Sequence, residues 1–140
     1  MIFPTREIIV AHNFQVIQAT GGEFFPPENL INPDSLEWVL DVIQYPLFDH
    51  LRYPSFSERM AILAWTIIDD HVFFDGNKRT AMYSMITFAK MNGVEVEVTN
   101  EEIIEKAVAI AKQNESKFTF DEFSSWVAGK TNFRYFNGYL

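Results

Sequence analysis

The sequence contains no cysteine, and only six glycines and six prolines among its 140 residues. Without cysteine the chain has no disulfide framework and no thiolate nucleophile or metal ligand, which is typical of a cytoplasmic protein. It also has no run of about 20 uncharged apolar residues, the length that a membrane-spanning helix needs. The first residues lack the basic-then-apolar layout of a secretory signal. We therefore expect a cytoplasmic protein that does not enter a membrane.

Basic residues are scarce as well: 11 Lys and Arg stand against 19 Asp and Glu, a formal net charge of −8. Broad nucleic-acid binding depends on Lys and Arg that neutralise phosphates, so this balance argues against a nucleic-acid partner. In contrast, hydrophobic residues make up 48% of the chain and 14 residues are phenylalanine. At this length they can form the core of one domain, which we assign to residues 1–129. The aromatic-rich tail, residues 130–140, should pack on another surface.

Capping signals and apolar periodicity predict six helices. Three of them begin with a capping box, a Ser or Thr followed three residues later by Glu, at Ser55, Thr99 and Thr119. The other three are expected over about residues 6–19, 33–43 and 80–91. Six helices joined by short connections predict an all-α bundle.

The remaining local signals lie at helix ends and in one alternating segment. Thr5 is expected to cap the first helix and Gly21 to end it in the left-handed conformation. Asn32 is expected to cap the second helix, with Pro33 at its first position. Residues 94–98 alternate like a short strand, but they have no obvious partner, so we interpret them as extended chain.

The most informative segment is residues 71–79, which read His-Val-Phe-Phe-Asp-Gly-Asn-Lys-Arg directly before a predicted helix. The backbone amides and the positive dipole end of a helix start favour an anion such as phosphate. Gly76 permits close backbone approach or positive φ, and Asn77 can cap the helix. Lys78 can neutralise phosphate as a point charge and Arg79 as a bidentate fork.

The same segment carries groups for catalysis. Asp75 is well placed to hold a Mg²⁺ ion that bridges nucleotide phosphates. His71, at the end of the preceding helix, could accept a proton from an attacking hydroxyl. Each residue also has a plainer interpretation: His71 as a helix C-cap, Asp75 and Gly76 as a hairpin turn, and Lys78 as one of two exposed cations. Their combination in nine positions favours a nucleotide or phosphate enzyme.

These residues also carry a family resemblance. The segment matches each fixed position of the pattern His-x-Phe-x-(Asp/Glu)-Gly-Asn-x-Arg through His71, Phe73, Asp75, Gly76, Asn77 and Arg79. This pattern is the signature of the Fic/Doc family, and lysine at the variable position, Lys78, is typical of its Doc (death-on-curing) branch. Residues 29–40 resemble the second-helix segment of Doc proteins, although Ile31 stands where that segment has arginine. The resemblance covers roughly residues 5–128.

The resemblance implies an all-helical Fic/Doc bundle in which a phosphate-binding loop opens a central helix. It implies that His71 is the general base, that Asp75 binds Mg²⁺, and that Gly76, Asn77, Lys78 and Arg79 bind the phosphates of ATP. The implied function is that of a Doc-like toxin of a toxin–antitoxin system. Such a toxin transfers a phosphate from Mg-ATP to a Ser, Thr or Tyr hydroxyl of a cytoplasmic protein, such as a translation factor. It blocks growth unless a small antitoxin holds it.

Two alternatives stay open. The first is a Fic-type AMP transferase, whose members usually carry glycine at the position of Lys78; the lysine fills space next to the phosphates and favours phosphorylation. The second is a non-catalytic module that binds an anion or an antitoxin. The segment 21–28, rich in Gly and Pro, has two interpretations as well: a flap that aligns a target chain by strand addition, or a plain connector between helices.

Overall fold

The computed structural model describes residues 1–136 and is mostly helical. The helices are α1 (Arg6–Thr20), α2 (Pro33–Val42), α3 (Phe56–Asp69), α4 (Asn77–Met91), α5 (Asn100–Ala111), α6 (Gln113–Ser116) and α7 (Phe120–Gly129), and the strands are β1 (Glu95–Val96) and β2 (Thr131–Asn132). The predicted helical class is confirmed, but the predicted count of six is not. Within residues 1–136 the single turn α6 is an additional, seventh helix. No helix in this range is long and apolar enough to cross a membrane.

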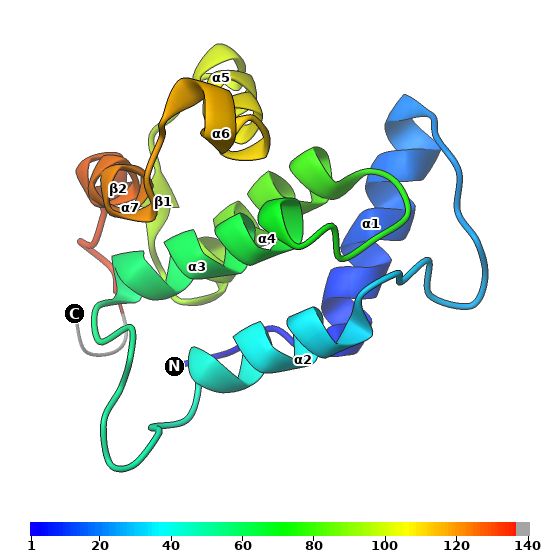
Figure 1. The fold of residues 1–140 in the computed structure, drawn as a ribbon. Helices are drawn as coiled ribbons and strands as arrows, with labels where there is room; N and C mark the ends of the chain where they lie inside the picture. The colour runs from blue at the N-terminus through cyan, green and yellow to red at the C-terminus, as the bar shows by residue number, and fades with distance from the viewer. Residues whose placement is uncertain (137–140) are drawn as a thin grey trace.

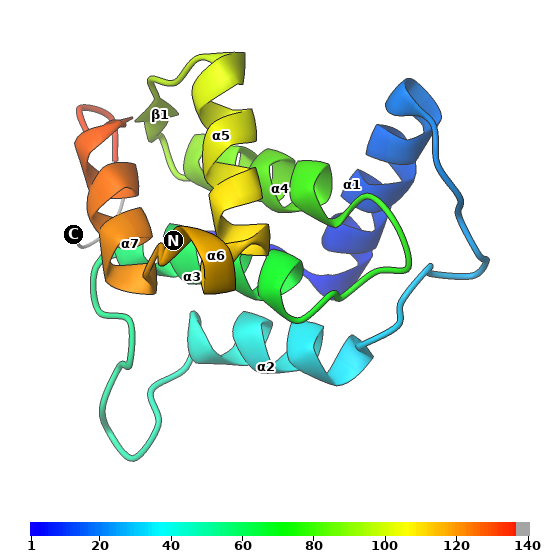
Figure 2. The same cartoon turned by 45° about the horizontal axis from the view of Figure 1, so that its top comes forward.

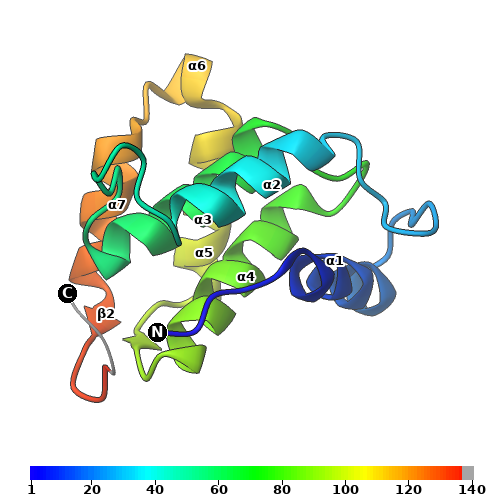
Figure 3. The ribbon, with the colours of Figure 1, turned by 90° about the horizontal axis from the view of Figure 1, so that it is seen from below.

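Helix α3 lies at the centre of the fold and contacts α2, α4, α5 and α7 (Figure 1). Most of its side chains are buried, as expected for a helix that has neighbours on several sides. Helix α4 runs beside α3, and Figure 2 shows α1 and α5 on opposite sides of α4. Seen from below, α2 covers α3 while α1 lies next to α4 (Figure 3). The loop from α3 to α4 contacts α1 through Asn13 and the segment between α1 and α2 through backbone hydrogen bonds.

The predicted helix starts are largely confirmed. The side chains of Ser55, Thr99 and Thr119 each cap their helix, and all three capping boxes are present. Asn32 is the N-cap residue of α2 and Pro33 follows at its first position, as predicted, but the Asn32 side chain makes no capping hydrogen bond: its amide donates to the carbonyls of Asp70 and His71 instead. Gly21 ends α1 with φ 88° and ψ 169°, a positive φ outside the left-handed helical region that we predicted.

The interpretation of residues 94–98 as unpaired extended chain is also wrong. Strand β1 pairs antiparallel with β2, and Glu95 lies opposite Asn132. The sequence could not indicate this, because the partner strand is two residues long and lies beyond three further helices. The described part of the tail then packs back on the core: the ring of Phe136 lies 4.9 Å from that of Phe56. The rest of the tail, residues 137–140, lies outside the described residues.

Candidate functional site: the loop between α3 and α4

Two buried side chains anchor the loop that joins α3 to α4, and the side-chain amide of Asn77 pairs with its backbone. Val72 and Phe73 are 0% and 1% exposed. The Phe73 N–H donates to Asn77 Oδ1, and Asn77 Nδ2 donates to the Phe73 carbonyl, both at 2.8 Å. The predicted capping role of Asn77 is therefore wrong: it is the first residue of α4, and its side chain fixes the shape of the loop. Its predicted contact with phosphate can still come from its backbone amide.

Gly76 is the N-cap of α4 and has left-handed dihedral angles, φ 78° and ψ 17°. This is the positive φ that we predicted, and it favours glycine over residues with a Cβ. Space is tight as well, because a Cβ here would lie 3.1 Å from Asn13 Nδ2 and 3.3 Å from Ile17 Cγ1, so these side chains would have to shift. Gly76 thus lets the loop turn directly into α4 while it contacts α1.

The start of α4 is electrostatically suited to an anion. Its first backbone hydrogen bond runs from the Thr80 N–H to the Gly76 carbonyl at 2.9 Å. The backbone N–H groups of residues 77–79 come before this bond and therefore make no hydrogen bond of the helical pattern. The first turn contains no acidic residue. It contains Lys78 and Arg79, which are exposed and take part in no ion pair within residues 1–136. Two cations at the positive end of a helix repel that end, and a bound anion would offset this cost.

A cavity of about 390 Å³ opens at this helix start. Residues 75–79 line one side of it. The other side is formed by apolar residues of α5: Ile103, Ile104, Ala107 and Val108. One end of the cavity is therefore cationic and rich in backbone amides, and the other end is an apolar wall. A nucleotide has the same division between its phosphates and its base.

Asp75 lies at the edge of this cavity with an exposed side chain. Its Oδ1 accepts the Gly76 N–H at 2.8 Å and its Oδ2 accepts the Glu23 N–H at 2.9 Å. Residues 1–136 contain no cluster of three or more His, Cys, Asp or Glu side chains that could hold a metal by themselves. The donor set therefore fits Mg²⁺ that is bound jointly by one carboxylate and by the phosphates of a ligand, a common arrangement for this ion.

His71 follows the end of α3 with a positive φ of 48° and has an exposed side chain. It is not among the cavity-lining residues of the described chain. An exposed imidazole in the same loop as Asp75 is accessible to a hydroxyl group of a second protein. The structure thus brings Asp75, Gly76, Asn77, Lys78 and Arg79 together at one cavity, and His71 lies outside its lining.

The other two histidines have different surroundings. His12 is buried, its Nδ1 lies 2.9 Å from Ser84 Oγ, and its ring packs edge-on against Tyr83. Burial lowers the pKa of His12 below its ordinary value of 6.5, so it is a neutral residue of the core at pH 7. His50 belongs to an exposed turn, in which its backbone pairs with that of Leu47.

Sequence reasoning missed a buried amide network behind the loop. The Phe25 N–H donates to Asn29 Oδ1 at 2.9 Å, and Asn29 Nδ2 donates to Asn13 Oδ1 at 2.9 Å. Asn13 Nδ2 in turn donates to the Asp75 carbonyl at 2.8 Å and to Thr80 Oγ1 at 3.1 Å. A signal was present: Asn13 lies four residues from both Ile9 and Ile17, on the apolar stripe of α1. A polar residue on such a stripe needs buried hydrogen-bond partners.

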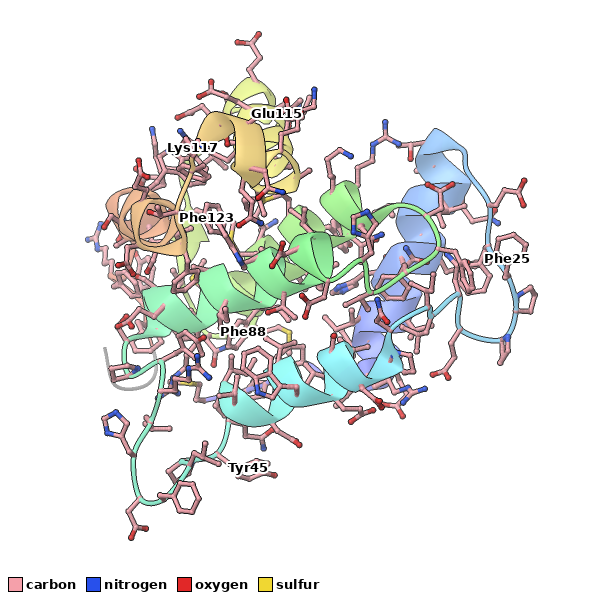
Figure 4. All side chains as sticks on the ribbon, in the orientation of Figure 1. Phe25, Tyr45, Phe88, Glu115, Lys117 and Phe123 are labelled. Carbon is pink, nitrogen blue, oxygen red and sulfur yellow. The ribbon has the colours of Figure 1, made fainter. Side chains whose placement is uncertain are left out.

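The segment between α1 and α2 also pairs with the loop through the backbone. The Ile31 N–H donates to the Val72 carbonyl at 2.8 Å, and the Phe74 N–H donates to the Asn29 carbonyl at 3.0 Å. The ring of Phe25, labelled in Figure 4 at the outer edge of this segment, packs 5.2 Å from the ring of Phe74. The segment is therefore attached to the loop along its length.

Comparison with known proteins agrees with this geometry. The model of the Fic/DOC family matches residues 3–89, which is more than half of the chain. The chain belongs to the Fic/DOC family. The match runs from α1 to near the end of α4, so it includes the loop 71–79 and the buried amides that support it. Members of the Fic/DOC family generally transfer nucleotidyl or phosphate groups. No curated protein matches the chain.

Proposed function

We propose that this Fic/DOC protein is a Doc-like toxin that transfers a phosphate from Mg-ATP to a hydroxyl group of a protein. The observation that carries the proposal is the divided cavity at the start of α4. Backbone amides, Lys78 and Arg79 form its phosphate end, and the apolar residues of α5 form a wall for the base. Phosphoryl transfer requires mainly positioning and charge neutralisation, which this arrangement can supply.

Each loop residue then has one task. Lys78, Arg79 and the first amides of α4 bind and orient the phosphates, and Asp75 holds Mg²⁺ together with them. The ion, when bound, neutralises charge on the phosphate oxygens. His71 accepts the proton of the target hydroxyl as its oxygen bonds to phosphorus, while the bond from phosphorus to the departing ADP oxygen breaks.

The choice of phosphorylation over AMP transfer is supported by Lys78. AMP-transferring relatives usually have glycine at this position, and here a long side chain lines the cavity beside Arg79. The target is proposed to be a cytoplasmic protein, such as a translation factor, presented to the exposed His71. The resemblance to Doc proteins implies, finally, that a small antitoxin binds the protein and inhibits it.

The test uses ATP labelled on either the α- or the γ-phosphate, incubated with the purified protein and a cell lysate. We expect label on protein from γ-labelled ATP only. His71→Ala should remove the label while ATP affinity stays within about twofold, because a general base contributes roughly 10²- to 10⁴-fold to rate and does not bind the nucleotide. His50→Ala, a histidine of an exposed turn, is the matched control and should label like the wild type.

The other outcomes are equally decisive. Label from the α-phosphate would make the protein an AMP transferase and refute the argument from Lys78. Unchanged labelling by His71→Ala would refute the assignment of the base. If the wild type binds Mg-ATP but labels no protein, even with candidate translation factors added, the non-catalytic binding module is the better interpretation.

A further inference from the structure

The segment between α1 and α2 reaches across to the carboxylate of Asp75. The Glu23 N–H donates to Asp75 Oδ2 at 2.9 Å. Gly22, the residue before it, has φ +122° and lies so close that a Cβ would stand 2.7 Å from Asp75 Oδ2 and 3.3 Å from its Cγ. A carbon atom cannot approach at this distance without displacing the carboxylate. The absence of a side chain at position 22 thus permits the hydrogen bond at position 23.

The neighbouring glycine shows that this closeness is specific. Gly21 also has a positive φ, +88°, but a Cβ placed there would have nothing within 4 Å. Both positions favour glycine for their backbone conformation. Only at position 22 does the approach to Asp75 also require glycine. A substitution at Gly21 therefore adds backbone strain alone, whereas the same substitution at Gly22 adds strain and a clash with Asp75.

Asp75 is exposed, and an exposed aspartate normally samples several rotamers. Here its main chain and both carboxylate oxygens are engaged. Asn13 holds its carbonyl, the Gly76 N–H holds Oδ1, and the Glu23 N–H holds Oδ2. A carboxylate has about four acceptor sites, so two hydrogen bonds leave each oxygen able to accept another partner. Asp75 is thereby oriented while it still lines the cavity.

We propose that Gly22 and the backbone N–H of Glu23 are positioning groups that hold Asp75 in the rotamer that binds the divalent cation of the nucleotide. The inference rests on the proposed function, in which Asp75 is the protein ligand of Mg²⁺. It adds that the α1–α2 segment sets the affinity for this cation. Hydrogen bonds to a ligating carboxylate commonly have this role, and their loss typically lowers metal affinity roughly 10- to 100-fold.

The experiment measures the metal-dependent gain in ATP affinity, the ratio of the dissociation constants in EDTA and in Mg²⁺. Gly22→Ala should reduce this gain roughly tenfold, with little change of the affinity in EDTA. Gly21→Ala, which bears a comparable strain, should keep it. Glu23→Pro, which removes the donor without adding an atom at position 22, should lose the gain like Gly22→Ala. Thermal unfolding checks that each variant is folded.

Hydrogen exchange of the Glu23 amide gives a readout that needs no nucleotide. The amide should be protected in the wild type and exchange at least tenfold faster in Asp75→Ala. The inference is overturned if Gly22→Ala keeps the full gain, if both glycine variants lose it equally, or if Asp75→Ala leaves the Glu23 exchange unchanged. A wild type that binds ATP without any metal-dependent gain would instead overturn the assignment of Asp75 in the proposed function, and the inference with it.

Discussion

The parts of the chain before and after residue 89 contribute different chemistry to one cavity. Residues 3–89 supply the loop, its cations and the buried amides of Asn13 and Asn29 that hold it. Residues 90–136 supply the apolar face of α5, together with the strand and tail that pack back on the core. The loop of the first part is held by directional hydrogen bonds, whereas the second part contributes apolar surface to the cavity.

This difference separates two tasks. The proposed phosphate ligands are donors and charges at fixed places, and all of them lie in the part that matches the family model. The apolar wall lies outside that match, on Ile103, Ile104, Ala107 and Val108. We infer that the first part determines that a phosphate group is bound, and that the second part determines which group is attached to that phosphate.

The largest expected effect is within the second part, where the turn after α4 meets the tail. Gly93 has φ +75°, and a Cβ there would overlap the backbone carbonyl of Tyr135, which cannot rotate away. Gly93→Ala should therefore lower the free energy of unfolding by about 2–4 kcal/mol, from overpacking together with left-handed strain. Urea denaturation measures this.

Gly129→Ala is the control for this substitution, because a Cβ there would have nothing within 4 Å. It should leave stability unchanged or raise it by less than about 1 kcal/mol, since alanine favours helix. A Gly93→Ala protein as stable as the wild type would mean that the tail does not pack against the turn after α4.

The second prediction concerns the phosphate end. Arg79→Ala should weaken ATP binding roughly 10- to 100-fold, because hydrogen bonds to charged groups contribute about 1.5–3 kcal/mol each. Isothermal titration calorimetry measures the affinity. Arg134→Ala, which removes an exposed arginine beside Tyr135 in the second part, should leave it unchanged. Equal losses in the two variants would indicate a general effect of net charge, not a phosphate site.

Separation along the chain explains what could be predicted from the sequence in both parts. The capping boxes at Ser55, Thr99 and Thr119 and the positive φ of Gly76 depend on residues a few positions apart, and all are confirmed. The loop residues at the cavity could be found for the same reason, since their chemistry is contiguous in sequence.

What could not be predicted depends on contacts between distant residues. The amide of Asn13 meets Asp75 across 62 positions, and nothing local indicates that Gly22 borders the same carboxylate. Asn32 stands at a helix start and is a common capping residue, but its side-chain amide donates to the carbonyls of Asp70 and His71 at the end of α3 instead. The turn α6 was missed because its N-cap, Lys112, makes no side-chain capping hydrogen bond.

The third prediction tests the apolar wall. Ile104 lines the cavity and is 63% exposed, so its replacement should not disturb the core. Ile104→Asn should weaken ATP binding by about 1 kcal/mol, roughly fivefold, by removing apolar contact area for the base. The affinity for inorganic triphosphate, which has no base, should not change. Calorimetry with both ligands measures the difference.

Leu47→Asn, a substitution of a similarly exposed residue in the turn 47–50, is the control and should affect neither ligand. If Ile104→Asn weakened the binding of ATP and of triphosphate equally, the wall would act on the phosphates. The division of tasks between the two parts of the chain would then be incorrect.

The smallest expected effect is a pH dependence that comes from the polar interior of the first part. Burial lowers the pKa of His12 below 6.5 in the folded protein, so between the folded pKa and 6.5 the unfolded chain binds more protons. The free energy of unfolding must then rise with pH in this window. Above it His12 is neutral in both states, and the destabilisation is absent. The expected loss between pH 7.5 and pH 6 is at most about 0.8 kcal/mol, by linkage from the unfolded pKa.

Urea denaturation at the two pH values measures this loss, and His12→Gln should remove it even if the variant is less stable at both. The difference between the two slopes isolates His12 from the carboxylates, which titrate at lower pH. Identical slopes in the wild type and the variant would mean that His12 can take up a proton in the folded state. The surroundings of His12, including the buried Ser84, would then be open to water, and the first part would be less rigidly held than its hydrogen bonds indicate.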